Sequence, residues 1–237
     1  MENKLTYDNW NDKVIDKLNN ELSDFMNVIK WAFKLYDDKI IYACSFGAEG
    51  VVLTDLIAKV NPQATVVFLD TNLHFKETYS LIENIKEKYP KLRIKLVEPS
   101  LTLEEQAAKH GDRLWESNPN TCCSIRKIQP LQKELSNVDA WFSGLRREQS
   151  IDRKQTQYIN KDNKFKRIKV CPLIHWTWDD IWSYIQLNNL PYNELHDRSY
   201  PSIGCTMCTL PVEAKADARS GRWSNFEKKE CGLHQTK

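Results

Sequence analysis

Apolar residues recur along the chain with two spacings, one typical of amphipathic helices and one typical of buried strands. The helical spacing first joins six residues and predicts an opening helix: Val14, Leu18, Leu22, Phe25, Ile29 and Phe33. Short apolar runs bounded by turn residues predict strands at residues 39–44, 65–69, 93–97 and 139–143, with helices at about 51–60 and 75–88. This alternation predicts an α/β fold, a parallel sheet with helices on both faces.

At 237 residues the chain is long enough for one large domain with a full hydrophobic core. Ligands of parallel sheets bind beyond the carboxyl ends of the strands, where the connecting loops meet. The loops after the predicted strands are therefore the expected location of a binding site.

Three of these loops carry groups suited to binding an anion. Residues 45–50 follow the first strand and open a helix, so their backbone N–H groups face an anion with the helix dipole behind them, although a plain strand-to-helix turn is the alternative. Asp70 follows the second strand and either belongs to the same site or caps the next helix. The loop 144–150 places Arg146 and Arg147 just past another strand end.

Five of the seven cysteines form the strongest chemical signal. They are the adjacent Cys122 and Cys123, the C-x-x-C of Cys205 and Cys208, and the isolated Cys231. Four thiolates divided between two segments are typical of a soft-metal or iron–sulfur site. Adjacent α-carbons lie only about 3.8 Å apart, which crowds two thiolates onto one zinc ion but suits two neighbouring irons. We therefore favour a [4Fe-4S] cluster over zinc, and Cys231 remains as a candidate nucleophile.

Composition excludes several classes of protein. The net charge of +2 gives no overall attraction to nucleic acid, and no stretch reaches membrane-spanning length or resembles a signal peptide. We therefore expect a cytoplasmic location. In that reducing compartment, seven cysteines, an odd number, argue against a disulfide framework and for metal binding or catalysis. Cys44 and Cys171 lie in apolar surroundings and are expected in the core.

Two later segments have less specific patterns. Residues 148–169 are rich in charged and amide side chains, which predicts a mobile surface loop or a flap that orders over substrate. A helix with Trp176, Trp178 and Trp182 follows, and Thr177 and Asp180 are expected to cap it.

The ordered motifs resemble those of the assimilatory adenylyl-sulfate reductases of the iron–sulfur, bacterial type, within the phosphoadenylyl-sulfate reductase family. They are Ser45-Phe46-Gly47, Leu69-Asp70-Thr71, Thr121-Cys122-Cys123 with Arg126-Lys127, the loop 144–150, Cys205-x-x-Cys208, Arg219-Ser220-Gly221-Arg222-Trp223 and Glu230-Cys231-Gly232-Leu233-His234. The resemblance implies an ATP-pyrophosphatase-like fold, also called adenine nucleotide alpha hydrolase-like. In pyrophosphatases of this fold the first loop resembles the motif Ser-Gly-Gly-x-Asp-Ser. This chain has Phe46 and Glu49 in that loop instead, which argues against ATP hydrolysis.

This resemblance also implies an activity. Such enzymes reduce adenosine 5′-phosphosulfate to sulfite and AMP in sulfate assimilation and cysteine biosynthesis, with thioredoxin or a glutaredoxin-like protein as donor. Cys231 would attack the sulfur and carry an S-sulfocysteine, on a mobile tail at about 224–237 of a single domain spanning 1–237. The cluster would support structure and local electrostatics rather than shuttle electrons.

The residues expected to bind the sulfonucleotide are Ser45, Phe46, Gly47, Asp70, Thr71, Lys127, Gly144, Arg146, Arg219, Arg222 and His234. Arg147 and Arg153 are expected to be solvated. His234 is equally compatible with a solvated position on the tail.

Three alternatives stay open at this point. The substrate is also compatible with the 3′-phosphorylated nucleotide, or with both nucleotides. An ATP-using adenylyltransferase on the same fold would require magnesium and would be indifferent to loss of Cys231. A non-enzymatic metal-binding module would use only the four paired cysteines. The sequence leaves the oligomeric state open, with a homo-oligomer possible.

Overall fold

The computed structural model describes residues 4–213, 216–224, 226 and 232–233. Within them, six strands form one sheet in the order β3-β2-β1-β4-β6-β5. The strands are β1 (Ile40–Cys44), β2 (Thr65–Leu69), β3 (Arg93–Val97), β4 (Ala140–Phe142), β5 (Ile159–Asp162) and β6 (Arg167–Val170). Neighbouring strands run parallel, apart from the antiparallel pair β5 and β6. The predicted α/β class is confirmed, with one antiparallel strand added at the edge of the sheet.

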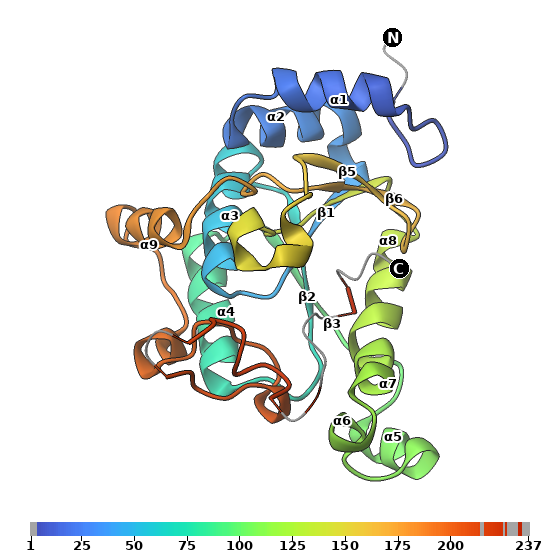
Figure 1. Cartoon of the computed structure of the whole chain (residues 1–237), viewed down its shortest axis with the longest axis vertical. Coiled ribbons are helices and arrows are strands. Elements are labelled where there is room, and N and C mark those ends of the chain that lie inside the picture. Colours follow the sequence, from blue (N-terminus) through green and yellow to red (C-terminus); the bar gives the residue numbers. More distant parts are fainter. Residues whose placement is uncertain (1–3, 214–215, 225, 227–231, 234–237) are drawn as a thin grey trace.

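Helices cover both faces of the sheet. They are α1 (Asp12–Glu21), α2 (Phe25–Tyr36), α3 (Ala48–Val60), α4 (Lys76–Lys88), α5 (Leu103–His110), α6 (Leu114–Ser117), α7 (Pro119–Cys123), α8 (Gln129–Leu135) and α9 (Trp178–Leu187). In Figure 1, α2, α3, α4 and α9 lie on one side of the sheet and α8 on the other. No helix in the described part of the chain is both long enough and apolar enough to cross a membrane.

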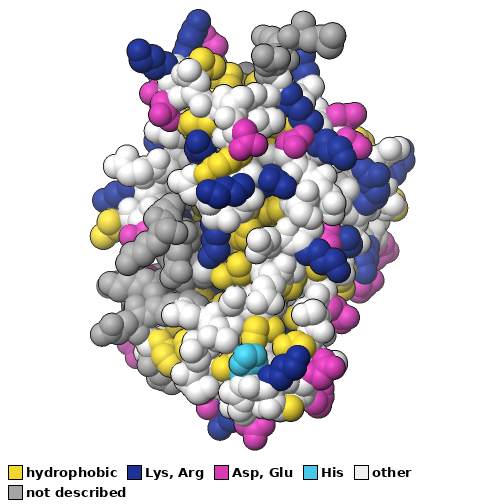
Figure 2. Space-filling view, turned by 90° about the vertical axis from the view of Figure 1, so that its right-hand side faces the viewer, with side chains coloured by type: hydrophobic (Ala, Val, Ile, Leu, Met, Phe, Trp, Pro, Cys, Tyr) yellow, Lys and Arg dark blue, Asp and Glu magenta, His cyan; other side chains and the backbone are white. Residues whose placement is uncertain are grey.

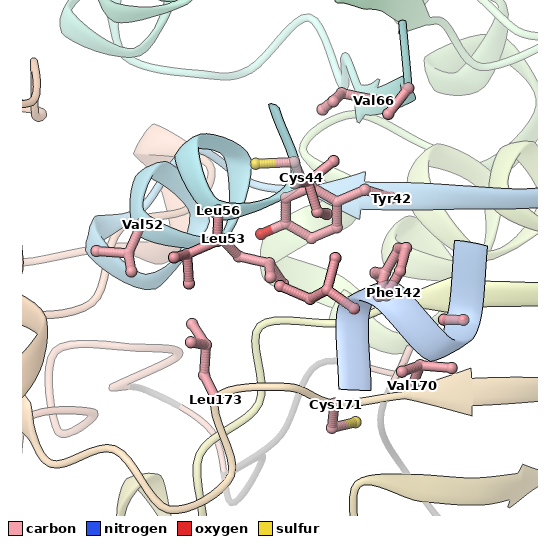
Figure 3. Close-up of a cluster of buried hydrophobic side chains, with 14 of the residues drawn as sticks. Tyr42, Cys44, Val52, Leu53, Leu56, Val66, Phe142, Val170, Cys171 and Leu173 are labelled. Carbon is pink, nitrogen blue, oxygen red and sulfur yellow. The ribbon is translucent and has the colours of Figure 1, made fainter. Parts of the chain in front are cut away.

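The sheet separates the two largest clusters of buried side chains in the described part of the chain, because successive residues of a strand point to opposite faces. Tyr42 and Cys44 of β1 belong to the larger cluster with α3, whereas Ile41 packs with Leu131 and Leu135 of α8. Figure 3 shows the larger cluster, with Val52, Leu53 and Leu56 from α3 and Tyr42, Phe142 and Val170 from the strands. Both faces of the central strands are therefore buried, as a parallel sheet requires.

Cys44 and Cys171 lie in this core, as the sequence predicts. Burial raises the pKa of Cys44 to about 11 and that of Cys171 to about 12, so both thiols stay protonated at neutral pH. Neither thiol has the thiolate character that a nucleophile requires.

The predicted single opening helix is wrong, because the chain forms α1 and α2 with a break between them. The break lies at Asp24, which is the N-cap of α2 and has an extended backbone. Its carboxylate accepts a hydrogen bond from the Asn27 backbone N–H at 2.9 Å. A carboxylate that satisfies a free N–H group of the first turn favours a new helix over continuation of the old one.

The predicted surface loop at 148–169 is in part a β-hairpin, formed by β5 and β6. Asp162 organises its turn by accepting hydrogen bonds from the backbone N–H groups of Lys164 and Phe165, at 3.1 and 3.3 Å. The same carboxylate pairs with Lys169 at 3.1 Å and accepts a hydrogen bond from the Trp141 indole at 3.1 Å. The charged residues that suggested a loop are therefore partly paired inside the sheet.

A helical excursion between β3 and β4 has no counterpart in the sequence-based prediction. It begins with a capping box, in which Thr102 and Glu105 exchange side-chain and backbone hydrogen bonds at the start of α5. Farther on, α7 and α8 are joined by a turn of π-helix at Ser124–Ile128. Wide turns of this kind are frequent at functional sites, and this one directly follows the cysteine pair.

A buried carboxylate joins three helices on the larger face of the sheet. Asp55 of α3 accepts hydrogen bonds from Tyr89 after α4 at 2.7 Å and from Tyr184 of α9 at 2.6 Å, and pairs with Lys59 at 2.8 Å. Burial alone would raise the pKa of Asp55, but these hydrogen bonds from Lys59, Tyr184 and Tyr89 hold it below the usual value. The ionised carboxylate therefore stabilises the fold.

We predict that Asp55→Ala lowers the free energy of unfolding by about 1–3 kcal/mol at pH 7, since the half-buried hydroxyls of Tyr89 and Tyr184 lose their acceptor. The depressed pKa makes this contribution present above about pH 4 and lost as the pH falls through the folded-state value. Urea unfolding at a series of pH values measures the difference. Lys17→Ala in the exposed Lys17–Glu21 pair is the control, with an expected change below about 0.5 kcal/mol. A difference that persists undiminished into acid would contradict the assignment.

Candidate active site

A cavity of about 440 Å³ lies at the carboxyl ends of the central strands. Its walls include residues that follow β1 and β4, the two neighbouring strands between which the order of the sheet reverses. β2 and β3 lie on one side of β1 and β4 lies on the other, so the loops after β1 and β4 separate and leave a crevice. The cavity therefore occupies the position that this topology favours for a ligand.

The loop after β1 presents its ends to the cavity and its middle to the core. Ser45 and Gly47 line the cavity, and Gly47 is the N-cap of α3. Phe46 instead has a left-handed backbone with φ of 51°, and its ring is buried against Phe68 with a centroid distance of 5.7 Å. The left-handed residue turns the chain sharply, which exposes the helix N-terminus to an anion.

Arg146 ties the loop after β4 to the start of α3. Its Nη2 lies 2.8 Å from an oxygen of Glu49, and its Nη1 lies 2.6 Å from Glu148. The guanidinium is buried and also lies over the Trp178 ring, 5.6 Å from its centroid. Two carboxylates thus balance its charge, and the pairing fixes one wall of the cavity. Gly144, expected from the sequence to bind the substrate, also lines the cavity.

Arg153 continues this network into the cavity. Gln149 donates a hydrogen bond to Glu49 at 2.8 Å and accepts one from Arg153. Arg153 is only 6% exposed and lines the cavity, so the expectation that it is solvated is wrong. Arg147 is half-buried and donates to the Thr156 carbonyl at 2.7 Å, which also differs from a solvated position. The sequence holds no signal for these contacts, because they depend on the fold of the 148–158 loop.

Three further cations face the cavity: Lys127, Arg219 and Arg222. Lys127 comes from the π-helical turn, whereas both arginines come from the 216–224 segment. Arg222 donates from Nε to the Cys208 carbonyl at 3.1 Å and from Nη1 to the Ser202 hydroxyl at 3.4 Å. These two hydrogen bonds hold the Arg222 guanidinium at the cavity wall. Together with Lys127 and Arg219 it gives this end of the cavity a positive charge, which suits an anionic ligand.

Asp70 and Thr71 lie outside the lining of the cavity. The Asp70 carboxylate accepts hydrogen bonds from the Asn72 backbone at 2.9 Å and from the Tyr79 hydroxyl at 2.7 Å. It does not cap α4, whose N-cap is Phe75. The Thr71 hydroxyl lies 3.3 Å from the Cys205 sulfur, which places it beside the cysteines.

The four paired cysteines come from two segments on this side of the cavity. Cys122 and Cys123 end α7 and are buried, whereas Cys205 and Cys208 flank a 3-10 turn. Burial raises the pKa of Cys122 to about 11, and the neighbouring Cys205 and Cys208 raise it further in the same direction. The two pairs therefore lie within electrostatic reach of one another.

The donor set fits a soft, multi-iron group. Among the described residues, no group of three or more His, Cys, Asp or Glu side chains is placed so that it could hold a metal ion. Burial, Cys205 and Cys208 all raise the pKa of Cys122, so this thiol needs nearby positive charge to become a thiolate, and iron would supply it. The positive charges of Arg126 and Lys127 likewise favour the thiolate, because they lower the pKa of Cys122.

Arg126 is buried and braces this region. It donates to the Thr71 carbonyl at 2.7 Å, to Gln106 at 3.0 Å and to Asn72 at 3.1 Å. The guanidinium thereby joins the helix with the cysteine pair to the loop after β2.

His74 is a cavity residue that the sequence reasoning missed. Its ring lies 3.1 Å from the Leu69 carbonyl and packs against Phe68. Burial, followed by the charge of Lys127, lowers the pKa of His74 to about 4, so the imidazole is neutral at physiological pH. In the sequence, the one indication that His74 belongs to the site is its position five residues after the end of β2.

Cys231 and His234 lie outside the described residues, as does most of the predicted tail at 224–237. Gly232 and Leu233, which follow Cys231, are described. Leu233 lines the cavity and packs with the α8 cluster, and the Gly232 carbonyl accepts a hydrogen bond from Lys164. The chain next to the predicted nucleophile thus lies at the cavity.

Two bacterial relatives cover nearly the whole chain. It is 59% identical over 235 residues to adenosine 5′-phosphosulfate reductase 2 of Bacillus subtilis (strain 168), covering 99% of this chain and 100% of the relative. It is 62% identical over 215 residues to adenosine 5′-phosphosulfate reductase of Halalkalibacterium halodurans, covering 91% and 93% of the two chains.

Solved structures support the same relationship. The crystal structure of phosphoadenylyl-sulfate reductase from Candida auris, a phosphate complex, has a TM-score of 0.73 at 33% identity, covering 85% of this chain and 98% of that chain. Candida glabrata FMN adenylyltransferase has a TM-score of 0.59 at 19% identity, covering 84% of this chain and 65% of that chain, and shares the fold alone. Residues 39–211 match the sequence profile of the phosphoadenosine phosphosulfate reductase domain. With its relatives aligned from end to end and this domain spanning most of its length, the chain belongs to the phosphoadenosine phosphosulfate reductase family.

Proposed function

We propose that the protein reduces adenosine 5′-phosphosulfate to sulfite and AMP. The observation that carries the proposal is a cavity lined by Lys127, Arg219 and Arg222 beside two cysteine pairs. The chain that holds it is 57–62% identical to reductases named for this nucleotide. A phosphosulfate is a compact anion, and three converging cations suit it.

The cations hold the substrate in this proposal, and Cys231 performs the chemistry. Its thiolate attacks the sulfur of the sulfate group, the bond from sulfur to the phosphate-bridging oxygen breaks, and AMP leaves with that oxygen. The enzyme then carries the sulfonate on the Cys231 sulfur. Lys127, Arg219 and Arg222 stabilise the charge that develops on the leaving phosphate. His234 stays a proposed contact of the same anion.

A dithiol protein completes the cycle. One of its thiolates attacks the Cys231 sulfur, sulfite leaves with the electrons of the broken sulfur–sulfur bond, and a mixed disulfide forms. The second thiol of the partner resolves this disulfide, so the partner ends oxidised and Cys231 is free again. Thioredoxin is the proposed donor, with a glutaredoxin-like protein as the alternative. The need for a reduced donor favours the cytoplasm.

We further propose that Cys122, Cys123, Cys205 and Cys208 hold a [4Fe-4S] cluster. Bound there, the cluster supplies structural cross-linking and a fixed charge beside the cavity, since the thiols already supply two electrons. Lys127 lowers the pKa of Cys122 and also lines the cavity, so it links the two regions electrostatically. The Cys205 turn is anchored through Thr206, whose backbone N–H donates to the Leu73 carbonyl at 2.8 Å.

The 3′-phosphorylated nucleotide is the second candidate substrate, because the Candida auris structure is of a phosphoadenylyl-sulfate reductase. That relative is 33% identical, whereas the bacterial relatives named for the unphosphorylated nucleotide are 57–62% identical. The larger identity favours adenosine 5′-phosphosulfate.

We predict that Cys231→Ser abolishes sulfite release, because a hydroxyl lacks the nucleophilicity of a thiolate and cannot form the adduct. Binding of the nucleotide, measured by calorimetry, should stay within about threefold of the wild type. Cys171→Ser, at a buried thiol away from the chemistry, controls for general effects of cysteine replacement. Turnover by the Cys231→Ser enzyme would sink the mechanism.

Replacing any of the four paired cysteines should bleach the anaerobically purified protein and lower its stability. A group that binds only the folded state contributes its binding free energy to folding, so its loss lowers the unfolding midpoint. Iron and sulfide analysis with thermal unfolding provides the measurement, and Cys44→Ala is the matched control. A variant that kept its full iron and sulfide content would remove that residue from the ligand set.

Truncation of Lys127, Arg219 or Arg222 to Ala should lower kcat/KM by about 10- to 100-fold. Each charge-assisted contact in a partly desolvated site is worth about 1.5–3 kcal/mol, and roughly 1.4 kcal/mol corresponds to a factor of ten. The exposed Arg198, which pairs with Glu77 and Glu194, is the control, with an expected change within about twofold. Equal, small effects at all four positions would mean that the anion binds elsewhere.

A further inference from the structure

The indole of Trp223 lies against both arginines of the anion end of the cavity. The Arg222 guanidinium carbon is 4.5 Å from the ring centroid, and that of Arg219 is 5.9 Å from it. Trp223 itself is only 4% exposed and is absent from the cavity lining, which both arginines form. An aromatic face attracts cations electrostatically, most strongly for Trp. The ring is therefore placed to hold the two guanidiniums without touching a ligand.

The backbone at Trp223 is held in an unfavourable conformation. Its φ is 50°, in the left-handed region that large side chains rarely adopt. The surrounding contacts fix it there: its N–H donates to the Cys208 carbonyl at 3.3 Å, and the preceding Arg222 forms a β-bridge with Thr209. Strain that is held by neighbouring structure is a marker of functional positions.

The neighbouring glycines leave room for this arrangement. A Cβ at Gly204 would overlap the Arg222 guanidinium, and a Cβ at Gly221 would overlap the Leu210 carbonyl. Without a side chain, Gly221 allows the backbone to approach Leu210 closely, and Gly204 leaves space for the Arg222 guanidinium next to the backbone. The segment 219–223 is thereby shaped to place Arg222 at a fixed position.

Arg219 and Arg222 bring two like charges to one end of the cavity. Arg219 and Arg222 are three residues apart in one turn, closed by a hydrogen bond from the Arg222 N–H to the Arg219 carbonyl at 2.9 Å. Asp217 also lines the cavity, and its carboxylate accepts from the Arg219 backbone N–H at 2.7 Å. The indole lies within cation–π distance of both guanidiniums, and this attraction favours their position at this end of the cavity.

We propose that Trp223 is a positioning residue, which holds Arg219 and Arg222 in the geometry that receives the phosphosulfate. The inference rests on the proposed function for the identity of that anion. Pre-placed cations do not have to be ordered when the substrate binds, so the ring improves affinity more than it improves the chemical step.

The test compares Trp223→Phe and Trp223→Leu in steady-state sulfite release at matched donor concentration. We expect Trp223→Leu to raise KM for adenosine 5′-phosphosulfate about tenfold and to change kcat less than about threefold, with Trp223→Phe between it and the wild type. Iron content and thermal unfolding midpoints are measured on each variant. Trp31→Leu, which removes an indole packed on Tyr36 in α2, is the matched control and should leave KM unchanged.

A double-mutant cycle separates positioning from packing. If the ring acts through the arginines, Trp223→Leu should raise KM by less than about threefold when Arg222 is already Ala. Additive effects, or equal losses in Phe and Leu variants with kcat lowered and KM unchanged, would overturn the inference. A wild-type enzyme that failed to reduce adenosine 5′-phosphosulfate would instead overturn the proposed function.

Discussion

Buried positive charge is the constraint around which this site is built. A guanidinium removed from water is costly unless hydrogen-bond acceptors or carboxylates surround it. Arg126 meets this requirement with the Thr71 carbonyl, Gln106 and Asn72, and Arg146 meets it with Glu49 and Glu148. In each case at least one partner comes from another segment of the chain, Glu49 for Arg146 and Thr71, Asn72 and Gln106 for Arg126, so satisfying the charge fixes the relative position of these segments.

The same requirement explains how the cavity and the cysteines are connected. Arg126 joins the cysteine pair of α7 to the loop after β2, and Arg222 joins the cavity wall to the second cysteine pair through the Cys208 carbonyl. Both of these hydrogen bonds end on backbone carbonyls, not on a cysteine sulfur. The cysteine pairs and the proposed anion site are therefore linked through the placement of cations, which is the supporting role that we propose for a cluster.

The sequence predicts the central sheet well and its periphery poorly. Strands 65–69 and 93–97 match β2 and β3 residue for residue, because they are continuous apolar or alternating runs bounded by turns. The β5–β6 hairpin escaped prediction because Asp162 and Lys169 are paired with each other in the sheet, whereas in the sequence both are typical of a polar loop. Arg153 was misplaced for the same reason, since only the folded 148–158 loop brings it to Gln149.

The π-helical turn at Ser124–Ile128 has a consequence for how this chain can vary. The helix before it must present its cysteines to the 205–208 segment, while the helix after it must present Leu131 and Leu135 to the sheet. Removing one residue from a helix rotates everything beyond it by about 100°. After a deletion at the turn, the cysteines of α7 and the leucines of α8 could not both keep their present directions. Either the cysteines would turn away from the 205–208 segment or the leucines would turn away from the sheet. The length of this segment is under tighter constraint than its composition.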